Sequence, residues 1–408
     1  MKALIRLVAV GVTAAFFAAA CSSGGSSTSS TSSPSATSSA AAAATSSKAA
    51  DLRTKLNILL GEHLILASKA TGAALGGRTD EYQAYGALLN QNGTDIGAMV
   101  GAAYGPDAEM KFNQIWSAHN GFFVDYTVGK AKNDAAMQQK AVDNLTTVYI
   151  PQFSEFIAGA TGLPKDTVAE LTKTHVLTTK QIVDDQAAKN WPAVSTDVRK
   201  AYAHMQMIGD PLSEAIAKKQ SDKFPGDATN KGVGLRVSLN LLLQEHLYLA
   251  SSATSAALGG RQDEFAAAGK ALNDNGTDLG AAIGSLYGAD AQAKFNGIWS
   301  AHNGFFVDYT TGVAKSDQAA KDKAVQNLTT VYIPQFSDFI AGATGLPNAA
   351  VADLTKTHVL TTKDIVDAQG AKDYKGSATK DRAAAQHMEM IADPLATAIV
   401  KKLPQKFE

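Results

Sequence analysis

Apolar residues recur every three to four positions along most of the chain after residue 51, which is the period of a helix that buries one face. Glycines and prolines interrupt this pattern at intervals typical of helix ends. In the first half of the chain the pattern predicts six helices, at residues 52–75, 80–104, 107–132, 134–160, 165–188 and 195–219. Pro151 and Pro211 should kink or split the fourth and sixth of them, because proline removes a helix hydrogen bond.

The same pattern then occurs a second time. Residues 52–224 align with residues 235–407 at a constant offset of 183, without a gap, and 115 of the 173 aligned positions are identical. A repeat of this length can bury its own core, and short connections make successive helices antiparallel neighbours. We predict an all-α protein with two tandem homologous up-and-down bundles of about six helices each. The bundles are expected at residues 51–224 and 235–408, with a linker at 225–234.

The N-terminal 20 residues have the pattern of a secretory signal peptide, with a basic start and an apolar run too short for a stable membrane span. Ala18-Ala19-Ala20-Cys21 resembles the lipobox of bacterial lipoproteins, although Ala18 stands where a lipobox usually has Leu. The resemblance implies cleavage before Cys21 and lipid attachment to it, which would anchor the protein at the extracytoplasmic face of a membrane or cell envelope. Cys21 is the only cysteine, so an intrachain disulfide is impossible. The alternative is an ordinary signal peptide followed by an incidental cysteine.

Residues 21–50 consist almost entirely of Ser, Thr, Ala and Gly. Such a segment has little to bury, so we predict a disordered, flexible tether between the lipidated Cys21 and the first bundle. Without residues 1–20 the chain keeps 35 of its 37 basic residues against 38 acidic ones, and these charges are dispersed. That distribution argues against nucleic acid as a partner, leaves the lipid anchor as the predicted contact with the membrane, and identifies no protein partner.

The histidines are the main candidates for chemistry. All eight lie within the repeats and correspond in pairs. The four in each repeat fall near the middle of the apolar faces of four different predicted helices, so their imidazoles could meet in one layer. These residues are His63, His119, His175 and His204 in the first repeat, and His246, His302, His358 and His387 in the second.

A metal ion would explain such a layer. A buried imidazole needs partners for both ring nitrogens, and a metal ion takes one nitrogen from each ring. A nitrogen-rich set without thiolates suits iron, copper, zinc or nickel better than magnesium or calcium. Met205 and Met207 hint at copper, although methionine more often fills gaps in a core. Six residues are candidate extra ligands or outer partners of the ion: Glu62, Asp95, Tyr126, Glu245, Asp278 and Tyr309.

The bundles resemble hemerythrin- and ferritin-like proteins in architecture only, because the Glu-x-x-His pairs of the di-iron bundles are absent. No phosphate-binding loop or nucleophile triad occurs either. We therefore predict a metal-binding lipoprotein for storage, delivery or sequestration, with one site per bundle, rather than an enzyme. Three alternatives stay open: a cell-surface interaction or spacer protein with structural histidine layers, a haem-binding bundle, and a metal-dependent oxidoreductase.

Overall fold

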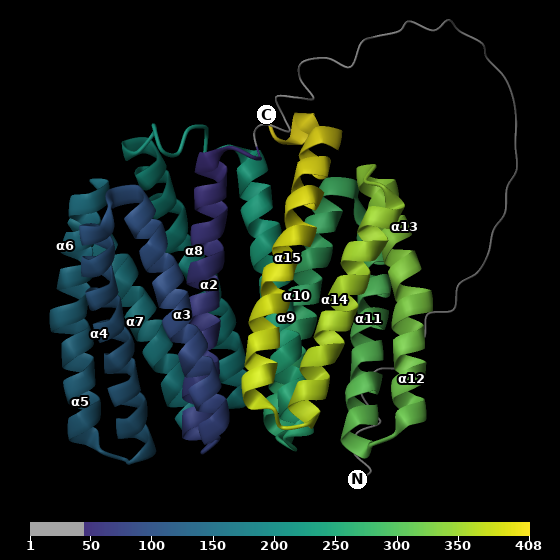
Figure 1. Cartoon of the computed structure of the whole chain (residues 1–408), viewed down its shortest axis with the longest axis horizontal. Coiled ribbons are helices and arrows are strands. Elements are labelled where there is room, and N and C mark those ends of the chain that lie inside the picture. The colour runs from purple at the N-terminus through teal and green to yellow at the C-terminus, as the bar shows by residue number, and fades with distance from the viewer. Residues whose placement is uncertain (1–44) are drawn as a thin grey trace, which may run out of the picture. The chain divides into compact units, whose positions relative to one another are not determined.

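The computed structural model describes residues 45–408, and no strand occurs among them, which confirms the all-α fold class. The predicted signal peptide, Cys21 and nearly all of the predicted tether lie outside the described residues. Figure 1 shows two groups of helices that run side by side with nearly parallel axes. The first group comprises α2 (Lys48–Leu75), α3 (Thr79–Tyr104), α4 (Pro106–Ala131), α5 (Ala135–Asp143), the π-helix η1 (Asn144–Tyr149), α6 (Ile150–Thr161), α7 (Lys165–Ala187) and α8 (Trp191–Lys219).

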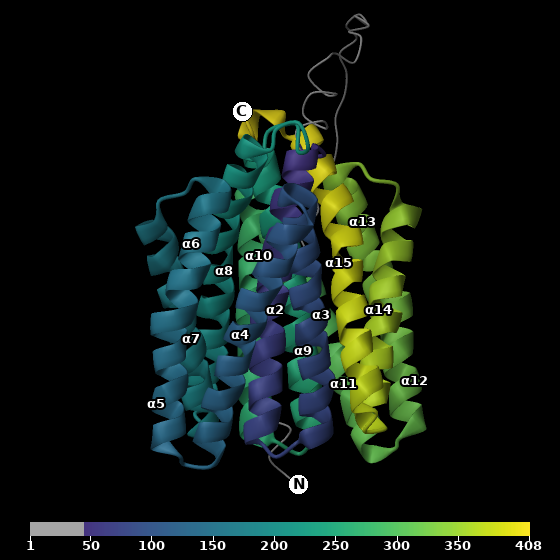
Figure 2. The ribbon, with the colours of Figure 1, turned by 60° about the vertical axis from the view of Figure 1, so that its left-hand side comes forward.

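The second group repeats this order at the offset of the sequence repeat. It comprises α9 (Lys231–Leu258), α10 (Gln262–Tyr287), α11 (Ala289–Lys315), α12 (Gln318–Asn327), the π-helix η2 (Leu328–Tyr332), α13 (Ile333–Thr344), α14 (Asn348–Gly370), α15 (Tyr374–Lys402) and a final 3-10 turn, η3 (Pro404–Lys406). Figure 2 shows the same arrangement from a second direction. We refer to residues 48–219 as bundle 1 and residues 231–402 as bundle 2.

The helix ends differ from the predicted ones by a few residues, for local reasons. Helix α2 begins at Lys48, inside the segment expected to be tether, because the Ser47 side chain accepts a hydrogen bond from the backbone N–H of Ala50. Helix α8 begins at Trp191 rather than at residue 195, since Pro192 fits a first turn that needs no backbone N–H. Helix α9 begins at Lys231, within the predicted linker.

The two internal prolines have different effects. The predicted fourth helix contains the π-helical turn η1 directly before Pro151, between α5 and α6. The residues at both junctions keep right-handed helical backbone angles, so the helix is locally widened and not split. Helix α8 instead continues past Pro211 to Lys219 without a break. The wider turn of η1 matters for the site, because π-helical turns re-aim side chains and occur often where proteins bind ligands.

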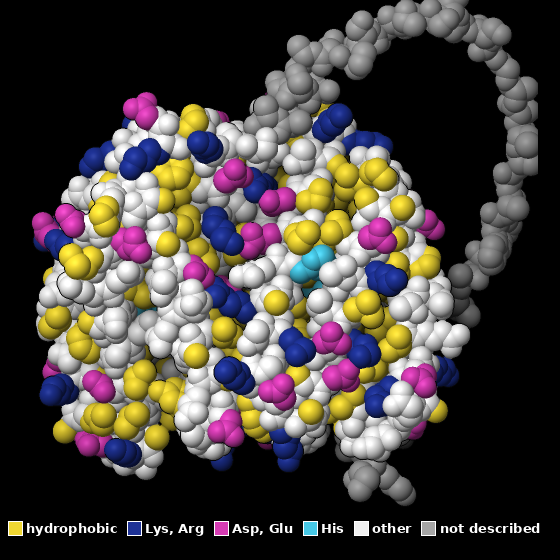
Figure 3. All heavy atoms as spheres, in the orientation of Figure 1, with side chains coloured by type: hydrophobic (Ala, Val, Ile, Leu, Met, Phe, Trp, Pro, Cys, Tyr) yellow, Lys and Arg dark blue, Asp and Glu magenta, His cyan; other side chains and the backbone are white. Residues whose placement is uncertain are grey.

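Each bundle has a core of Leu, Ile and aromatic side chains, and α2 and α9 are the central helices. Helix α2 packs against α3, α8 and α7 of its own bundle and against α9 of bundle 2. By length and composition α2 could span a membrane, but most of its apolar stretch is buried inside the protein. On the face drawn in Figure 3, basic and acidic side chains alternate without a patch of a single sign.

Candidate metal centre

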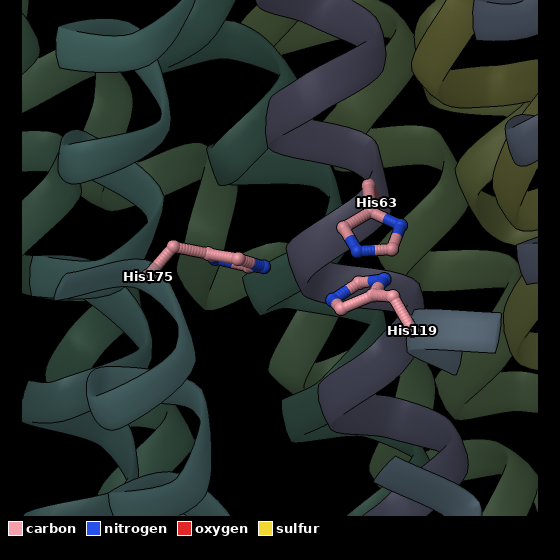
Figure 4. Close-up of side chains that lie close together, drawn as sticks. All are labelled: His63, His119 and His175. Carbon is pink, nitrogen blue, oxygen red and sulfur yellow. The ribbon is translucent and has the colours of Figure 1, made fainter. Parts of the chain in front are cut away.

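Three of the four predicted histidines of bundle 1 converge. Helix α2 supplies His63, α4 supplies His119 and α7 supplies His175, and all three side chains are at most 3 % exposed. Their ring centres form a nearly equilateral triangle, with sides of 5.5, 5.9 and 5.6 Å. Figure 4 shows the three rings directed toward one another. One nitrogen from each ring lies within 4.8 Å of the other two, so this triad could hold a metal ion.

Four of the six ring nitrogens of the triad make no hydrogen bond among residues 45–408. Both nitrogens of His119, the Nδ1 of His63 and the Nε2 of His175 are buried without a hydrogen bond of normal geometry. The Trp116 backbone and the Asn120 side chain are the polar groups close enough to raise the pKa of His119 slightly. The Nδ1 of His175 has one weak contact, 3.5 Å from the Thr179 hydroxyl. Buried polar groups in proteins are nearly always satisfied, so several orphaned nitrogens at one point are an unusual feature that a bound ion would resolve.

Aromatic side chains enclose the triad. The ring of Tyr149, the last residue of η1, stacks on His119 with centres 4.4 Å apart, and Phe123 contacts the same imidazole edge-on. The indole of Trp116 lies 4.7 Å from the ring of His63. The π-helical turn that precedes Pro151 thus ends at the aromatic ring that covers the site.

Bundle 2 contains the same constellation. His246 on α9, His302 on α11 and His358 on α14 have ring-centre separations of 5.6, 6.1 and 5.5 Å. Their ligand nitrogens also lie within 4.8 Å of one another, and both nitrogens of His302 are unpartnered among residues 45–408. Tyr332 of η2 covers His302 as Tyr149 covers His119.

Burial keeps the triad rings neutral. It lowers the pKa of His63 to about 3, with the neighbouring His175 as a second cause, and it lowers the pKa of His175 to about 4, with His204 as the second cause. The pKa of His119 falls well below its ordinary value because of burial and the two neighbouring rings. The same directions and causes hold in bundle 2. A neutral imidazole has a free lone pair, which is the form that binds metals.

The fourth histidine of each bundle does not join its triad. The Nε2 of His204, on α8, lies 2.9 Å from the backbone carbonyl oxygen of Leu171, and the Nε2 of His387 lies 3.0 Å from that of Leu354. His204 therefore has a hydrogen-bonded structural position beside the triad. The predicted layer of four imidazoles contains three that converge.

Glu62 and Asp95 lie at the contact between the bundles. Both carboxylates accept hydrogen bonds from Arg382 of bundle 2, and Glu62 also accepts one from Asn92 and one from the Tyr248 hydroxyl. Glu62 is 2 % exposed, so its charge is compensated almost entirely inside the protein. The side chain that directly precedes His63 thus points away from the triad and into an ion pair with the other bundle.

The equivalent pair in bundle 2 behaves in the same way. Arg199 of bundle 1 donates hydrogen bonds to Glu245 and Asp278. The sequence contained a signal for these arginines. Between residues 191–200 and 374–383 only two of ten aligned positions are identical, and one of them is Arg199 with Arg382.

Tyr126 and Tyr309 are also engaged elsewhere. The Tyr126 hydroxyl donates a hydrogen bond of 2.7 Å to Asp184, which also pairs with Lys130 and Lys180. Tyr309 donates likewise to Asp367. Each hydroxyl is thus engaged in a hydrogen bond to a carboxylate.

An apolar cavity of about 40 Å³ adjoins the first triad. His175, Trp116 and Tyr149 line it on the side of the triad, and the buried Met205 is part of its wall. Met207 is 61 % exposed and does not line this cavity. Of these two methionines only Met205 lines the cavity, together with Met99 of α3.

The fold and the two triads define a class of protein: an all-α tandem repeat with a buried all-histidine centre in each copy. Neither a protein-family model, nor a curated protein, nor a solved structure matches the chain. Its function must therefore be argued from the site itself. Three neutral imidazoles on separate rigid helices can supply a preformed nitrogen ligand set, and their apolar walls would exclude water from the ion.

Proposed function

We propose that the chain is an exported, lipid-anchored extracytoplasmic protein in which each bundle binds one transition-metal ion through its histidine triad. The export and lipid anchor rest on the signal-peptide pattern and the lipobox-like sequence that ends at Cys21. Metal binding rests on one observation above all: in each triad one nitrogen of every ring faces the other two rings, and most of the triad nitrogens are buried without a hydrogen bond among residues 45–408.

The triad needs little adjustment to bind an ion. Three atoms that lie 4.8 Å apart are each about 2.8 Å from their common centre, and metal–imidazole bonds are about 2.0–2.1 Å long. Each nitrogen would therefore move by less than about 1 Å, which small side-chain rotations supply. Iron, copper and zinc all accept imidazole ligands at this distance.

Two alternative functions fit the site less well. A structural layer of histidines should be joined by hydrogen bonds, as His204 is to Leu171, yet the triad nitrogens have almost none. A haem group needs a pocket of several hundred Å³, as organic ligands of its size do, and the cavity beside the first triad measures about 40 Å³.

Storage, delivery or sequestration agrees better with the site than turnover does. Catalysis at a metal centre usually needs an accessible coordination position and a nearby acid or base. The triads are buried, and the nearest sequence candidate for a base, Glu62, is held by Arg382. The proposed role is therefore to hold the ion.

The test measures metal content of the full-length protein, expressed without a histidine tag, by elemental analysis. We expect about two equivalents of a transition metal in the wild type, in line with its two triads. The double variant His119→Phe/His302→Phe should lose both equivalents, because each change removes one of three ligands. The matched control is His204→Phe/His387→Phe, which changes the two histidines outside the triads and should retain the metal. Metal-free wild-type protein that also fails to take up any of these ions would overturn the proposal.

A further inference from the structure

The charges of the triad ligands support a further inference, which rests on the proposed function. Each triad consists of three neutral ligands, and among the described residues no Asp or Glu oxygen joins either group. The rings are almost fully buried and packed against aromatic side chains. An ion bound there would keep its whole charge in a medium of low polarity.

The acidic side chains singled out in the sequence supply no ligand to the triads and are held in ion pairs between the bundles. Glu62 already accepts hydrogen bonds from Arg382, Asn92 and Tyr248, and Asp95 shares the same arginine. In bundle 2, Glu245 and Asp278 share Arg199 in the same way, so each group of two carboxylates and one arginine keeps one net negative charge. That residual charge belongs to an ion-paired group at the contact between the bundles and not to a ligand of the ion.

The cost of burying an ion rises with the square of its charge, so a divalent ion is far more disfavoured than a monovalent one in such a site. A bound hydroxide could reduce the charge of a divalent ion, as it does in open zinc sites. Hydroxide would need hydrogen-bond partners, and the rings of Trp116, Phe123 and Tyr149 that enclose the first site offer few. Their polar atoms are the Tyr149 hydroxyl and the Trp116 Nε1, which lies beside Gly93 of α3. The site therefore favours a monovalent ion over a divalent one.

From these observations we infer that the triads are built for a singly charged transition-metal ion, Cu(I). Copper is the ion among iron, copper and zinc that has a stable monovalent state, and three nitrogen ligands suffice for it. The thioether side chain of Met205 lies in the cavity wall with His175, which adds a soft, polarisable group to the surroundings. Met388 takes the equivalent buried place in bundle 2.

The test compares ions on the full-length, metal-free protein without a tag. Cu(I), Zn²⁺ and Fe²⁺ are titrated separately under anaerobic conditions against chromophoric chelators of known affinity. We expect two equivalents of Cu(I), bound roughly 100-fold or more tightly than Zn²⁺ or Fe²⁺. The copper should stay silent in electron paramagnetic resonance after exposure to air, because oxidation to Cu(II) would double the buried charge. The His119→Phe/His302→Phe variant should lose the copper, and His204→Phe/His387→Phe should keep it.

The outcomes separate the two proposals. Zn²⁺ or Fe²⁺ bound at the triads as tightly as Cu(I), or copper that oxidises at once to a Cu(II) signal, would overturn the inference about charge and leave metal binding intact. Protein that binds none of the three ions would overturn the proposed function as well.

Discussion

Replacing His119 with phenylalanine should stabilise the metal-free protein, which is the opposite of what a core substitution normally does. Both nitrogens of His119 are buried without a hydrogen bond of normal geometry among the described residues. An unsatisfied buried polar group costs about 1–3 kcal/mol, so two nitrogens together cost a few kcal/mol. Phenylalanine removes this cost and packs against Phe123 and Tyr149, but its larger ring costs about 1–3 kcal/mol in a tight site. The expected net gain is about 1–2 kcal/mol.

His204→Phe is the matched control in the same bundle. It deletes a hydrogen bond that is made, between Nε2 and the Leu171 carbonyl oxygen, and should destabilise the protein by about 1 kcal/mol. Urea unfolding of chelator-treated protein, followed by circular dichroism, measures both free energies. The two substitutions should change the free energy of unfolding in opposite directions. Equal destabilisation by both substitutions would show that His119 is a satisfied core residue and would refute the reasoning for a ligand site.

Three further predictions follow from the packing and charges. Metal-free protein should lose stability as the pH falls from about 6.5 toward 3–4, by up to about 1.4 kcal/mol per pH unit for each triad histidine, because the unfolded chain binds protons in this range and the buried rings do not. Unfolding midpoints at pH 7, 6 and 5 measure this loss, and midpoints that do not change with pH would contradict the prediction. Arg382→Met should lower the free energy of unfolding by about 3–5 kcal/mol because it leaves Glu62 buried without its arginine, and Arg382→Met/Glu62→Met should recover most of that loss in the same assay. A double variant no more stable than the single one would show that the ion pair is not the cause. Gly61→Ala should lower the melting temperature, since a Cβ there would lie 2.7 Å from the Tyr202 ring, while Gly86→Ala, which has open space, should raise it slightly; calorimetry that finds equal shifts would refute the packing argument.

The sequence alone was sufficient for the fold class and for the approximate position of every helix in residues 52–219. Helical periodicity and helix breakers are local features, so they can be read from a few adjacent turns. The same locality explains the boundary errors. Whether α8 starts at Trp191 or four residues later depends on a single turn, which the periodicity leaves undetermined.

The histidines show where sequence reasoning ended. Their positions on apolar faces correctly predicted burial of the triads, and three of the four rings in each bundle converge. Periodicity places a side chain on a face within a broad sector and does not give its distance from a neighbouring helix. That distance depends on helix packing, so only the tertiary structure separated the converging His175 from His204, whose Nε2 lies against the Leu171 carbonyl oxygen.

The partners of the acidic residues could not be predicted from the sequence. Glu62 precedes His63 in the chain and was a reasonable candidate outer partner of the ion, yet its partner is Arg382, 320 residues away in the second repeat. Repeat periodicity describes each copy by itself and contains no information about how the copies pack. The chain's local pattern thus determined the helices and the inward-facing histidines, whereas packing between distant helices decided which groups remain free to bind an ion and which are held in ion pairs.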